Sequence, residues 1–307
     1  MPALEINGLT KAFKDTVAVD DLTLTVPEGS VYGFLGPNGA GKTTTLKLLA
    51  GLIKPDAGSI VIAGETVRFG RSLSPDVLGY LPDVPGFYSW MSATEFLRFC
   101  ARLFGMPGAE RERRIDELLD LVGLRPAKGK RIAGFSRGMR QRLGIAQALI
   151  NRPKVVLRDE PASALDPIGR KEVMEIIRRL AASATVFFST HILDDVERIC
   201  DQVAILGEGR LLLTDTMDAI RKRYAHPSIA VRVRDEDTEP FRQMLSGMDW
   251  VRDIQVTDDG QLRIAPADME AAGRFIPRAV AEAGTALLHY QPLRPTLEDI
   301  FVEVVKS

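Results

Sequence analysis

A glycine-rich segment near the N-terminus has the residue types and spacing of a phosphate-binding loop. It fits G-x-x-x-x-G-K-[ST] and consists of Gly36, Pro37, Asn38, Gly39, Ala40, Gly41, Lys42, Thr43 and Thr44. Glycines let successive backbone N–H groups wrap a phosphate, and the N-terminus of a following helix adds partial positive charge. We expect Lys42 to reach the β- and γ-phosphates of a nucleotide and the Thr43 hydroxyl to ligate Mg²⁺. The alternative is a surface glycine-rich turn.

Two adjacent carboxylates end the apolar run Val155 to Glu160. Successive residues of a strand point to opposite faces, so Asp159 and Glu160 are predicted to have different roles. Asp159 suits direct or indirect support of Mg²⁺. Glu160 suits a general base, or a group that positions water, for attack on a γ-phosphate. The alternative is an acidic strand end that faces a helix N-terminus.

A histidine, His191, follows the apolar run ThrValPhePheSerThr. A lone histidine is more often a packed or surface residue than a catalytic one. At the carboxyl end of a parallel strand, however, it lies where ligands of such sheets bind. His191 is therefore a candidate for the same site.

Hydrophobic periodicity predicts the elements that position these residues. Strands are expected in the first 26 residues and at 31–35, 59–62, 155–157 and 186–189, and a hairpin at 203–206 and 211–213. Helices are expected from Lys42 to Gly51, over 94–124, after Ser136, over 169–182 and after His191. Gly51 suits the position just after a helix end. Strands that alternate with helices indicate an α/β domain with a mainly parallel sheet, and the first strands suggest an antiparallel addition.

A second unit is predicted after a linker helix at 217–224. Its strands are expected at 229–233, 251–256, 262–264 and 286–290, with a turn at Asp258, Asp259 and Gly260. Its helices are expected at 239–245, 268–283 and from Thr296. This βαββαβ order is the ferredoxin-like pattern.

Length and composition agree with a two-domain globular protein. The chain has 307 residues, of which 45% are hydrophobic and 26% charged, with a net charge of −1. We see no membrane-spanning run and no signal peptide, and Cys100 and Cys200 lack metal-ligand spacing. These features predict a cytosolic chain with reduced thiols.

Charge is unevenly distributed along the chain. Residues 121–158 contain ten Lys or Arg and no Asp or Glu, whereas residues 225–307 contain nine Lys or Arg against fourteen Asp or Glu. The basic stretch is either a solvated face or a surface that approaches phosphate.

Taken together, these motifs make the chain resemble the ATP-binding subunit of ABC transporters over about residues 3–215. GPNGAGKTT is similar to the Walker A motif, FSRGMRQR (135–142) to the ABC signature, VVLRDEP to Walker B, SALD (163–166) to the D-loop and STH to the H-loop. Phe13 matches the aromatic residue that stacks on adenine in this family.

The resemblance implies a fold and a mechanism. The fold is α/β: a P-loop NTPase domain over 1–216 with a mainly parallel sheet, an antiparallel β subdomain and a helical subdomain at about 84–152. A small α+β ferredoxin-like domain, accessory or regulatory, follows at 217–307. ATP and Mg²⁺ are the implied cofactors. Two cassettes would sandwich two ATP molecules, with the helix that begins at Ser136 and Gly138 facing the γ-phosphate held by the other cassette.

The chain departs from the family pattern at three places. The glutamine that helps to ligate Mg²⁺ and senses the membrane partner is replaced by Asp83, which can still bind Mg²⁺. The signature carries Arg137 and Met139, a form similar to bacterial exporters of drugs, polysaccharides or lipids. Arg158 replaces an apolar residue, and a buried charge there is costly unless paired. We expect either a nearby acid or exposure at the strand end.

The resemblance thus predicts the motor subunit of an exporter, at the cytoplasmic face of the membrane, with a second cassette and a permease as partners and no nucleic acid. Pro295 to Phe301 matches a segment typical of the exporters' C-terminal domain, and it also reads as a helix capped by Thr296. Two alternatives stay open. One is a soluble ABC ATPase that acts on ribosomes or DNA, although a second cassette, coiled-coil heptads and Cys clusters are lacking. The other is a non-catalytic nucleotide-binding regulator.

Overall fold

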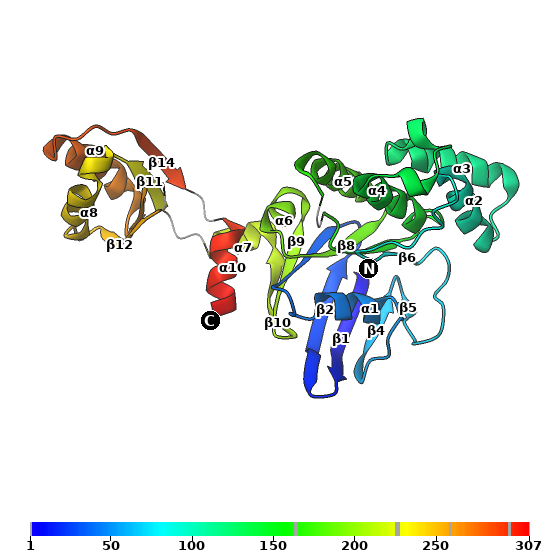
Figure 1. Ribbon diagram of the computed structural model, residues 1–307. Coiled ribbons are helices and arrows are strands. Elements are labelled where there is room, and N and C mark those ends of the chain that lie inside the picture. Colours follow the sequence, from blue (N-terminus) through cyan, green and yellow to red (C-terminus); the bar gives the residue numbers. More distant parts are fainter. Residues whose placement is uncertain (1, 163–164, 225–227, 258, 294–295, 307) are drawn as a thin grey trace. The chain divides into compact units, whose positions relative to one another are not determined.

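The computed structural model in Figure 1 describes residues 2–162, 165–224, 228–257, 259–293 and 296–306. Ser163 of the predicted D-loop, Asp258 of the predicted turn and Pro295 of the C-terminal segment lie outside the described residues. The chain divides into two compact units, Met1–Met217 and Asp218–Ser307. Each is described by itself below.

A six-stranded sheet forms the centre of the first unit. Its strand order is β10-β9-β3-β8-β7-β6, and all neighbours are parallel except the β9–β10 hairpin. The bounds are β3 Val31–Leu35, β6 Leu78–Leu81, β7 Val155–Asp159, β8 Thr185–Thr190, β9 Gln202–Gly207 and β10 Arg210–Thr216. Every residue of β3, β7 and β8 is buried, which explains why these strands read as continuous apolar runs rather than alternating ones. The predicted mainly parallel sheet is confirmed.

An antiparallel sheet of order β2-β1-β4-β5 packs on the central one. Its strands are β1 Pro2–Phe13, β2 Thr16–Pro27, β4 Ala57–Ile62 and β5 Glu65–Thr66. Alternate residues of β2, such as Leu22, Leu24 and Val26, are buried, and they share one apolar cluster with Tyr32 and Phe187 of the central sheet. The alternation in the first 26 residues therefore reflects a sheet with one face buried.

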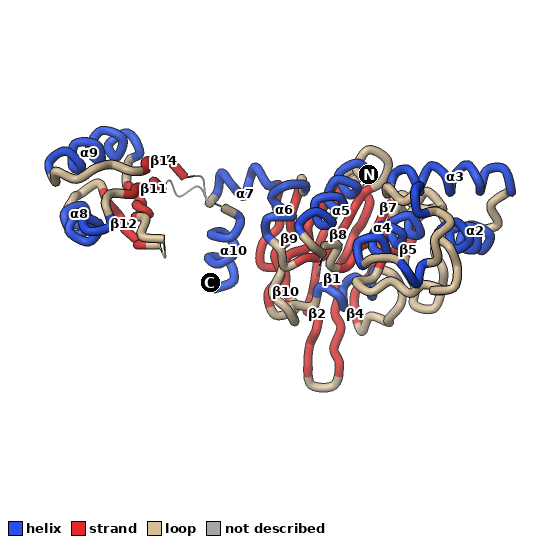
Figure 2. Tube along the Cα trace, turned by 45° about the horizontal axis from the view of Figure 1, so that its top comes forward, coloured by secondary structure: helices blue, strands red, loops and turns tan. Residues whose placement is uncertain are grey.

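Helices cover the central sheet and form a separate group at one end of the unit. Figures 1 and 2 show α2, α3 and α4 together there, and α4 packs on the edge strand β6. The bounds are α1 Lys42–Leu49, α2 Ala93–Leu103, α3 Gly108–Leu121, α4 Arg137–Ala148, α5 Pro167–Leu180 and α6 Leu193–Ile199, with short 3-10 turns at Arg125–Ala127 and Ile132–Gly134. Gly51 has a left-handed φ of 67° and follows the end of α1, as predicted.

The expected helix over 94–124 is wrong as one continuous element. It is split into α2 and α3, because Gly105 adopts a left-handed φ of 69° after α2 and Pro107 occupies the position before α3. A proline ring cannot continue a helix through its own amide, so the chain turns between the two helices.

The second unit contains a four-stranded antiparallel sheet of order β12-β13-β11-β14. Its elements are α7 Met217–Arg223, which begins at the boundary, β11 Ser228–Arg232, a 3-10 turn Asp235–Asp237, α8 Thr238–Ser246, β12 Val251–Val256, β13 Leu262–Pro266, α9 Met269–Glu282, β14 His289–Leu293 and α10 Leu297–Lys306. The first and last strands of the βαββαβ run are thus neighbours, and the expected ferredoxin-like order is confirmed. The strand expected at 286–290 lies three residues later.

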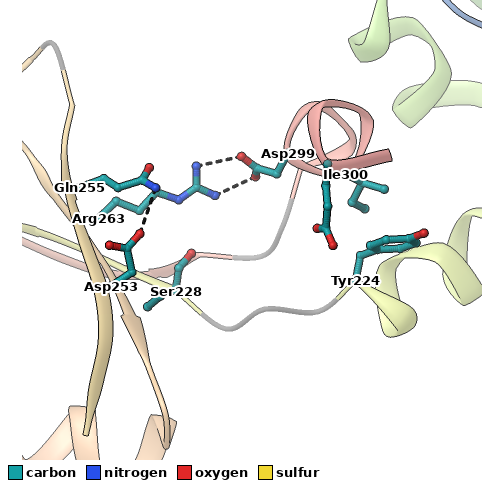
Figure 3. A pocket seen from close by; sticks show the side chains of 9 residues that line it. Tyr224, Ser228, Asp253, Gln255, Arg263, Asp299 and Ile300 are labelled. Atoms are coloured by element: carbon teal, nitrogen blue, oxygen red, sulfur yellow. Dashed lines mark hydrogen bonds and ion pairs between the residues drawn. The ribbon is translucent and has the colours of Figure 1, made fainter. Parts of the chain in front are cut away.

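An ion pair ties the last helix to this sheet. Arg263 of β13 donates to both carboxylate oxygens of Asp299, at 2.9 and 2.7 Å, as Figure 3 shows. Thr296 caps α10, because its hydroxyl accepts from the amide of Asp299, as the sequence predicted. The pair borders a cavity of about 190 Å³ that Ser228 and Asp253 also line.

Candidate functional site

The predicted site residues follow strands that end at one edge of the central sheet. Strands β3, β8, β7 and β6 are parallel neighbours, so their carboxyl ends lie side by side. The phosphate loop follows β3, His191 follows β8, Glu160 follows β7 and Asp83 follows β6. Sheet pairing therefore gathers residues that are up to about 150 positions apart in the sequence.

The phosphate loop needs its glycines for two different reasons. Gly39 and Gly41 have left-handed φ values of 86° and 96°. A side chain at Gly41 would also place a Cβ 2.2 Å from the carbonyl oxygen of Ala18 in β2. Gly41 stands at the start of α1 without a side-chain cap, so the first N–H groups of this helix can donate to an anion.

Lys42 is folded back over this loop. Its ammonium donates to the carbonyls of Gly36, at 2.7 Å, and Pro37, at 3.1 Å, and only 6% of the residue is exposed. Burial lowers the pKa of Lys42, and the carboxylates of Glu160 and Asp159 oppose that shift. A cation held among loop carbonyls can transfer its hydrogen bonds to phosphate oxygens.

The two carboxylates after β7 occupy different surroundings, as the strand alternation predicted. Asp159 is buried, and its Oδ1 accepts a hydrogen bond of 2.5 Å from the Ser189 hydroxyl. Glu160 has a left-handed φ of 44°, a strained conformation for a residue with a side chain. Its amide donates to the carbonyl of Ser189, at 3.1 Å, which fixes this backbone to the neighbouring strand.

The Glu160 side chain joins His191 and Lys42 in one cluster. Nδ1 of His191 lies 3.0 Å from the Glu160 carboxylate, and the Lys42 ammonium lies 3.9 Å from it. His191 is about half exposed, whereas the Glu160 side chain is 16% exposed. A carboxylate in this position can orient a water molecule or accept its proton.

The residues predicted for Mg²⁺ fit an ion that arrives with phosphate groups. Among the residues that the structure describes, no group of three or more His, Cys, Asp or Glu could hold a metal ion by itself. Mg²⁺ bound to nucleotide is commonly held through one or two carboxylates together with phosphates and water. Thr43 and Asp159 stand beside the phosphate loop and suit that role. The part of Asp83 in Mg²⁺ binding remains a prediction.

Phe13 ends β1 with its ring about half exposed. The Lys11 ammonium lies 5.3 Å from the ring centroid, and Lys11 in turn pairs with Asp56 at 2.8 Å. Strand β2 of the same hairpin borders the phosphate loop at Gly41. The ring is accessible to a base, and its contact with adenine remains a prediction.

Ser136 and Gly138 stand apart from this cluster. The Ser136 hydroxyl accepts from the Met139 amide at 3.2 Å, which confirms the predicted N-cap of α4. However, α4 packs mainly on β6, α2, α3 and α5, whereas the phosphate-loop helix α1 packs on β2, β7 and β8. The exposed start of α4 is flanked by exposed Arg137 and Arg140. This helix end can therefore receive an anion from outside.

Arg158, Gln141 and Ser189 add to the predicted site. Arg158 is 2% exposed, so the expectation that it reaches solvent at the strand end is wrong. Burial lowers the pKa of Arg158 to about 9, and the negative charge of Asp83 opposes that shift. Gln141 and Ser189 were not predicted from the sequence as site residues. The position of Ser189, directly before Thr190 and His191, was an available signal, because a small hydroxyl there can reach the next strand.

Both units match known protein families. Residues 19–163 match the family described as "ABC transporter", and residues 216–305 match the family described as "ATP-binding protein DrrA1-3-like, C-terminal domain". The chain is 38% identical to the ABC transporter ATP-binding protein YxlF of Bacillus subtilis, over 99% of this chain and 100% of that protein. It is 36% identical to the bacitracin transport ATP-binding protein BcrA of Bacillus licheniformis, over 98% and 97%. A solved ATP-binding subunit of an ABC transporter matches with a TM-score of 0.64 and 34% identity, over 72% of this chain and 93% of that one.

Replacing Lys42 with Ala is expected to weaken ATP binding at least about tenfold, since a charge-assisted hydrogen bond contributes roughly 1.5–3 kcal/mol. Isothermal titration calorimetry measures the dissociation constant directly. The matched control is Lys47→Ala, an exposed lysine on the same helix. Equal affinity for the Lys42→Ala variant and the wild type would remove Lys42 from the phosphate site.

Proposed function

The chain belongs to the ABC transporter family as an ATP-binding and ATP-hydrolysing subunit, and from this membership we propose that it powers export through a separate membrane permease. The observation that carries the proposal is the meeting of phosphate loop, buried lysine, two carboxylates and histidine at one sheet edge. Two such chains would close on two ATP molecules, and hydrolysis would reopen them.

Each side chain has a distinct role in this proposal. Lys42 and the amides of the phosphate loop hold the phosphates, and Phe13 stacks on adenine. Glu160 accepts the proton of the attacking water, while His191 holds the Glu160 carboxylate in place. The support for this assignment is the 3.0 Å contact between the two side chains and the strained backbone that aims Glu160. Thr43, Asp159 and Asp83 would hold Mg²⁺ with the phosphates, and the bound ion would supply charge neutralisation for the leaving group.

The separation of α4 from the phosphate loop supports a shared site. An anion-binding helix start that faces outward, at Ser136 and Gly138, needs a phosphate from another molecule. A second copy of the chain offers it through its own phosphate loop, which makes a symmetric pair with two equivalent sites. We therefore propose a homodimer.

An exposed apolar surface follows Asp83 in the sequence, and it supports the proposal that the chain binds a membrane protein. Val84, Tyr88 and Trp90 are 77%, 49% and 65% exposed, and the Tyr88 ring contacts those of Trp90 and Phe99. Clustered exposed apolar side chains mark interaction sites. None of the helices in the described part of the chain is long and apolar enough to span a bilayer. Attachment at the cytoplasmic face through a permease therefore fits this surface.

The direction of transport and the second unit complete the proposal. Similarity to a bacitracin transport protein and to the DrrA1-3-like C-terminal domain supports export, and it supports an accessory or regulatory domain over 217–307 after the ATPase domain of 1–216.

Replacing Glu160 with Gln is expected to lower kcat for ATP hydrolysis at least about 100-fold, because a general base contributes roughly 10²–10⁴-fold. ATP-dependent dimerisation should persist, since amide and carboxylate have the same shape. A phosphate-release assay measures kcat, and analytical ultracentrifugation in the presence of ATP measures dimerisation. Glu175→Gln, a half-exposed glutamate on α5, is the control. Turnover at the wild-type rate in the Glu160→Gln variant would overturn the proposed base.

Mixing two inactive variants tests the shared site. Lys42→Ala removes the phosphate loop's cation, and Ser136→Arg blocks the helix start. Each homodimer should be inactive. An equal mixture should recover about a quarter of wild-type turnover, because half of randomly formed dimers keep one complete site. A mixture as inactive as its components, with dimers shown to exchange, would argue against a site built from two chains.

Replacing Trp90 with Glu is expected to reduce co-purification of an integral membrane protein with the tagged chain by about tenfold, because a buried carboxylate costs several kcal/mol. Mass spectrometry of detergent-solubilised host membranes measures the partner. ATP binding should be unchanged. Leu288→Glu, on an exposed leucine of the second unit, is the control. Undiminished recovery would place the permease contact elsewhere.

A further inference from the structure

An ion pair joins α5 to α6, the short helix that follows His191. Asp195 lies on α6, and only 1% of it is exposed. Its Oδ1 accepts a hydrogen bond of 2.7 Å from Nε of Arg170 on α5, whereas its Oδ2 has no hydrogen-bond partner within the described residues. Figure 1 shows α5 and α6 side by side. A carboxylate shielded from water is costly unless a cation compensates it, so Asp195 depends on Arg170.

Arg170 lies in the first turn of α5, next to the segment that matches the D-loop. Its amide donates to the carbonyl of Asp166, at 2.9 Å, and Asp166 caps the helix by accepting from the Gly169 amide, at 2.9 Å. Asp166 is the last residue of the D-loop segment, so Arg170 follows that segment by one helical turn. The guanidinium also lies 4.0 Å from the exposed carboxylate of Asp194, but an ion pair in solvent contributes little.

The position of α6 determines where His191 lies. Only Ile192 separates His191 from the start of α6, and the Ile192 amide donates to the Thr190 hydroxyl, at 3.0 Å. Val196 of α6 is buried so close to β3 that a Cβ at Gly33 would lie 3.1 Å from its Cγ1. A helix of seven residues has too few internal hydrogen bonds to be stable by itself. Its contact with β3 and its ion pair with α5 therefore hold it in place.

We propose that Arg170 is a positioning residue for His191, which it holds through Asp195 and α6. The proposal rests on the proposed function, in which His191 keeps the Glu160 carboxylate in place from a distance of 3.0 Å. Apolar burial against β3 is non-directional, whereas the hydrogen bond from Arg170 to Asp195 fixes an orientation. The ion pair thereby also connects the end of the D-loop segment to the hydrolytic residues.

Turnover of Arg170 variants tests this role. R170M removes the cation but keeps a long apolar stem, and it should lower kcat about tenfold with KM for ATP within about twofold, because His191 is displaced while the phosphate loop is intact. R170K should recover most of the lost turnover, since the contact is one hydrogen bond rather than a bidentate pair. The matched control is R179M, which changes an exposed arginine of the same helix and should leave kcat unchanged. A wild-type kcat in R170M would overturn the positioning role.

A double variant separates positioning from stability. R170M should lower Tm by about 5 °C or more, because Asp195 is left buried without a cation. R170M/D195L replaces the pair with apolar side chains and should recover to within about 2 °C of the wild type. Its kcat should stay low, because the directed bond is still missing. Recovery of kcat together with Tm would show that Arg170 acts on stability alone and would overturn the positioning role. If R170M does not fold, the double variant carries the kinetic test.

The NMR signal of the His191 ring tests its placement without relying on turnover. The chain has three histidines, so ¹³C-labelled histidine gives few ring signals, and the one lost in His191→Asn belongs to His191. In the absence of nucleotide, R170M should shift this signal and R179M should not, while the signal of His289 in the second unit stays in both. An unmoved His191 signal in R170M would overturn the proposal. A shifted signal together with normal turnover in Glu160→Gln would overturn the proposed base, and the placement of His191 by Arg170 would stand.

Discussion

The parallel hydrogen-bonded register of β3, β8, β7 and β6 is the constraint on which the site depends. Parallel pairing brings four carboxyl ends to one edge, so that the phosphate loop, His191, Glu160 and Asp83 emerge side by side. No local signal could achieve this, because the segments are separated by whole helices. The buried apolar strands also exclude water, and charges at this edge therefore act on one another strongly.

The site has a second requirement, which is that the buried cations at this edge have compensating partners. The edge holds two buried cations, Lys42 and Arg158. The Glu160 carboxylate lies 3.9 Å from the Lys42 ammonium, and Arg158 donates to the side chain of Gln141 and to the carbonyl of Pro161. Removing Glu160 would leave the buried Lys42 ammonium without this carboxylate, which is costly for a charge shielded from water. The same arrangement prepares the site for a phosphate, whose charge Lys42 can receive when it releases the loop carbonyls.

The predicted site residues lie in two separate parts of the first unit. Phosphate loop, base and histidine share the sheet edge, whereas the Ser136 helix start belongs to the helical group on β6. This division is the structural reason for proposing that two chains complete each other's sites. Gln141 is the point where the two places meet inside one chain, because it lies on α4 and bonds both Arg158 and the loop of Asp83.

The sequence by itself determined whatever depends on a few consecutive residues: the glycine loop before α1, the Ser136 and Thr296 caps, the end of α1 at Gly51, and different surroundings for Asp159 and Glu160. The ferredoxin-like order and the mainly parallel sheet also followed from alternating elements. Pro107 was a local signal for a break in the range 94–124. The helix-favouring composition of that range nevertheless led to the prediction of one continuous helix. Only the tertiary structure decided the burial of Arg158 and its hydrogen bond to Gln141, because the energy of a buried charge depends on partners, such as this residue 17 positions away, that the fold brings beside it.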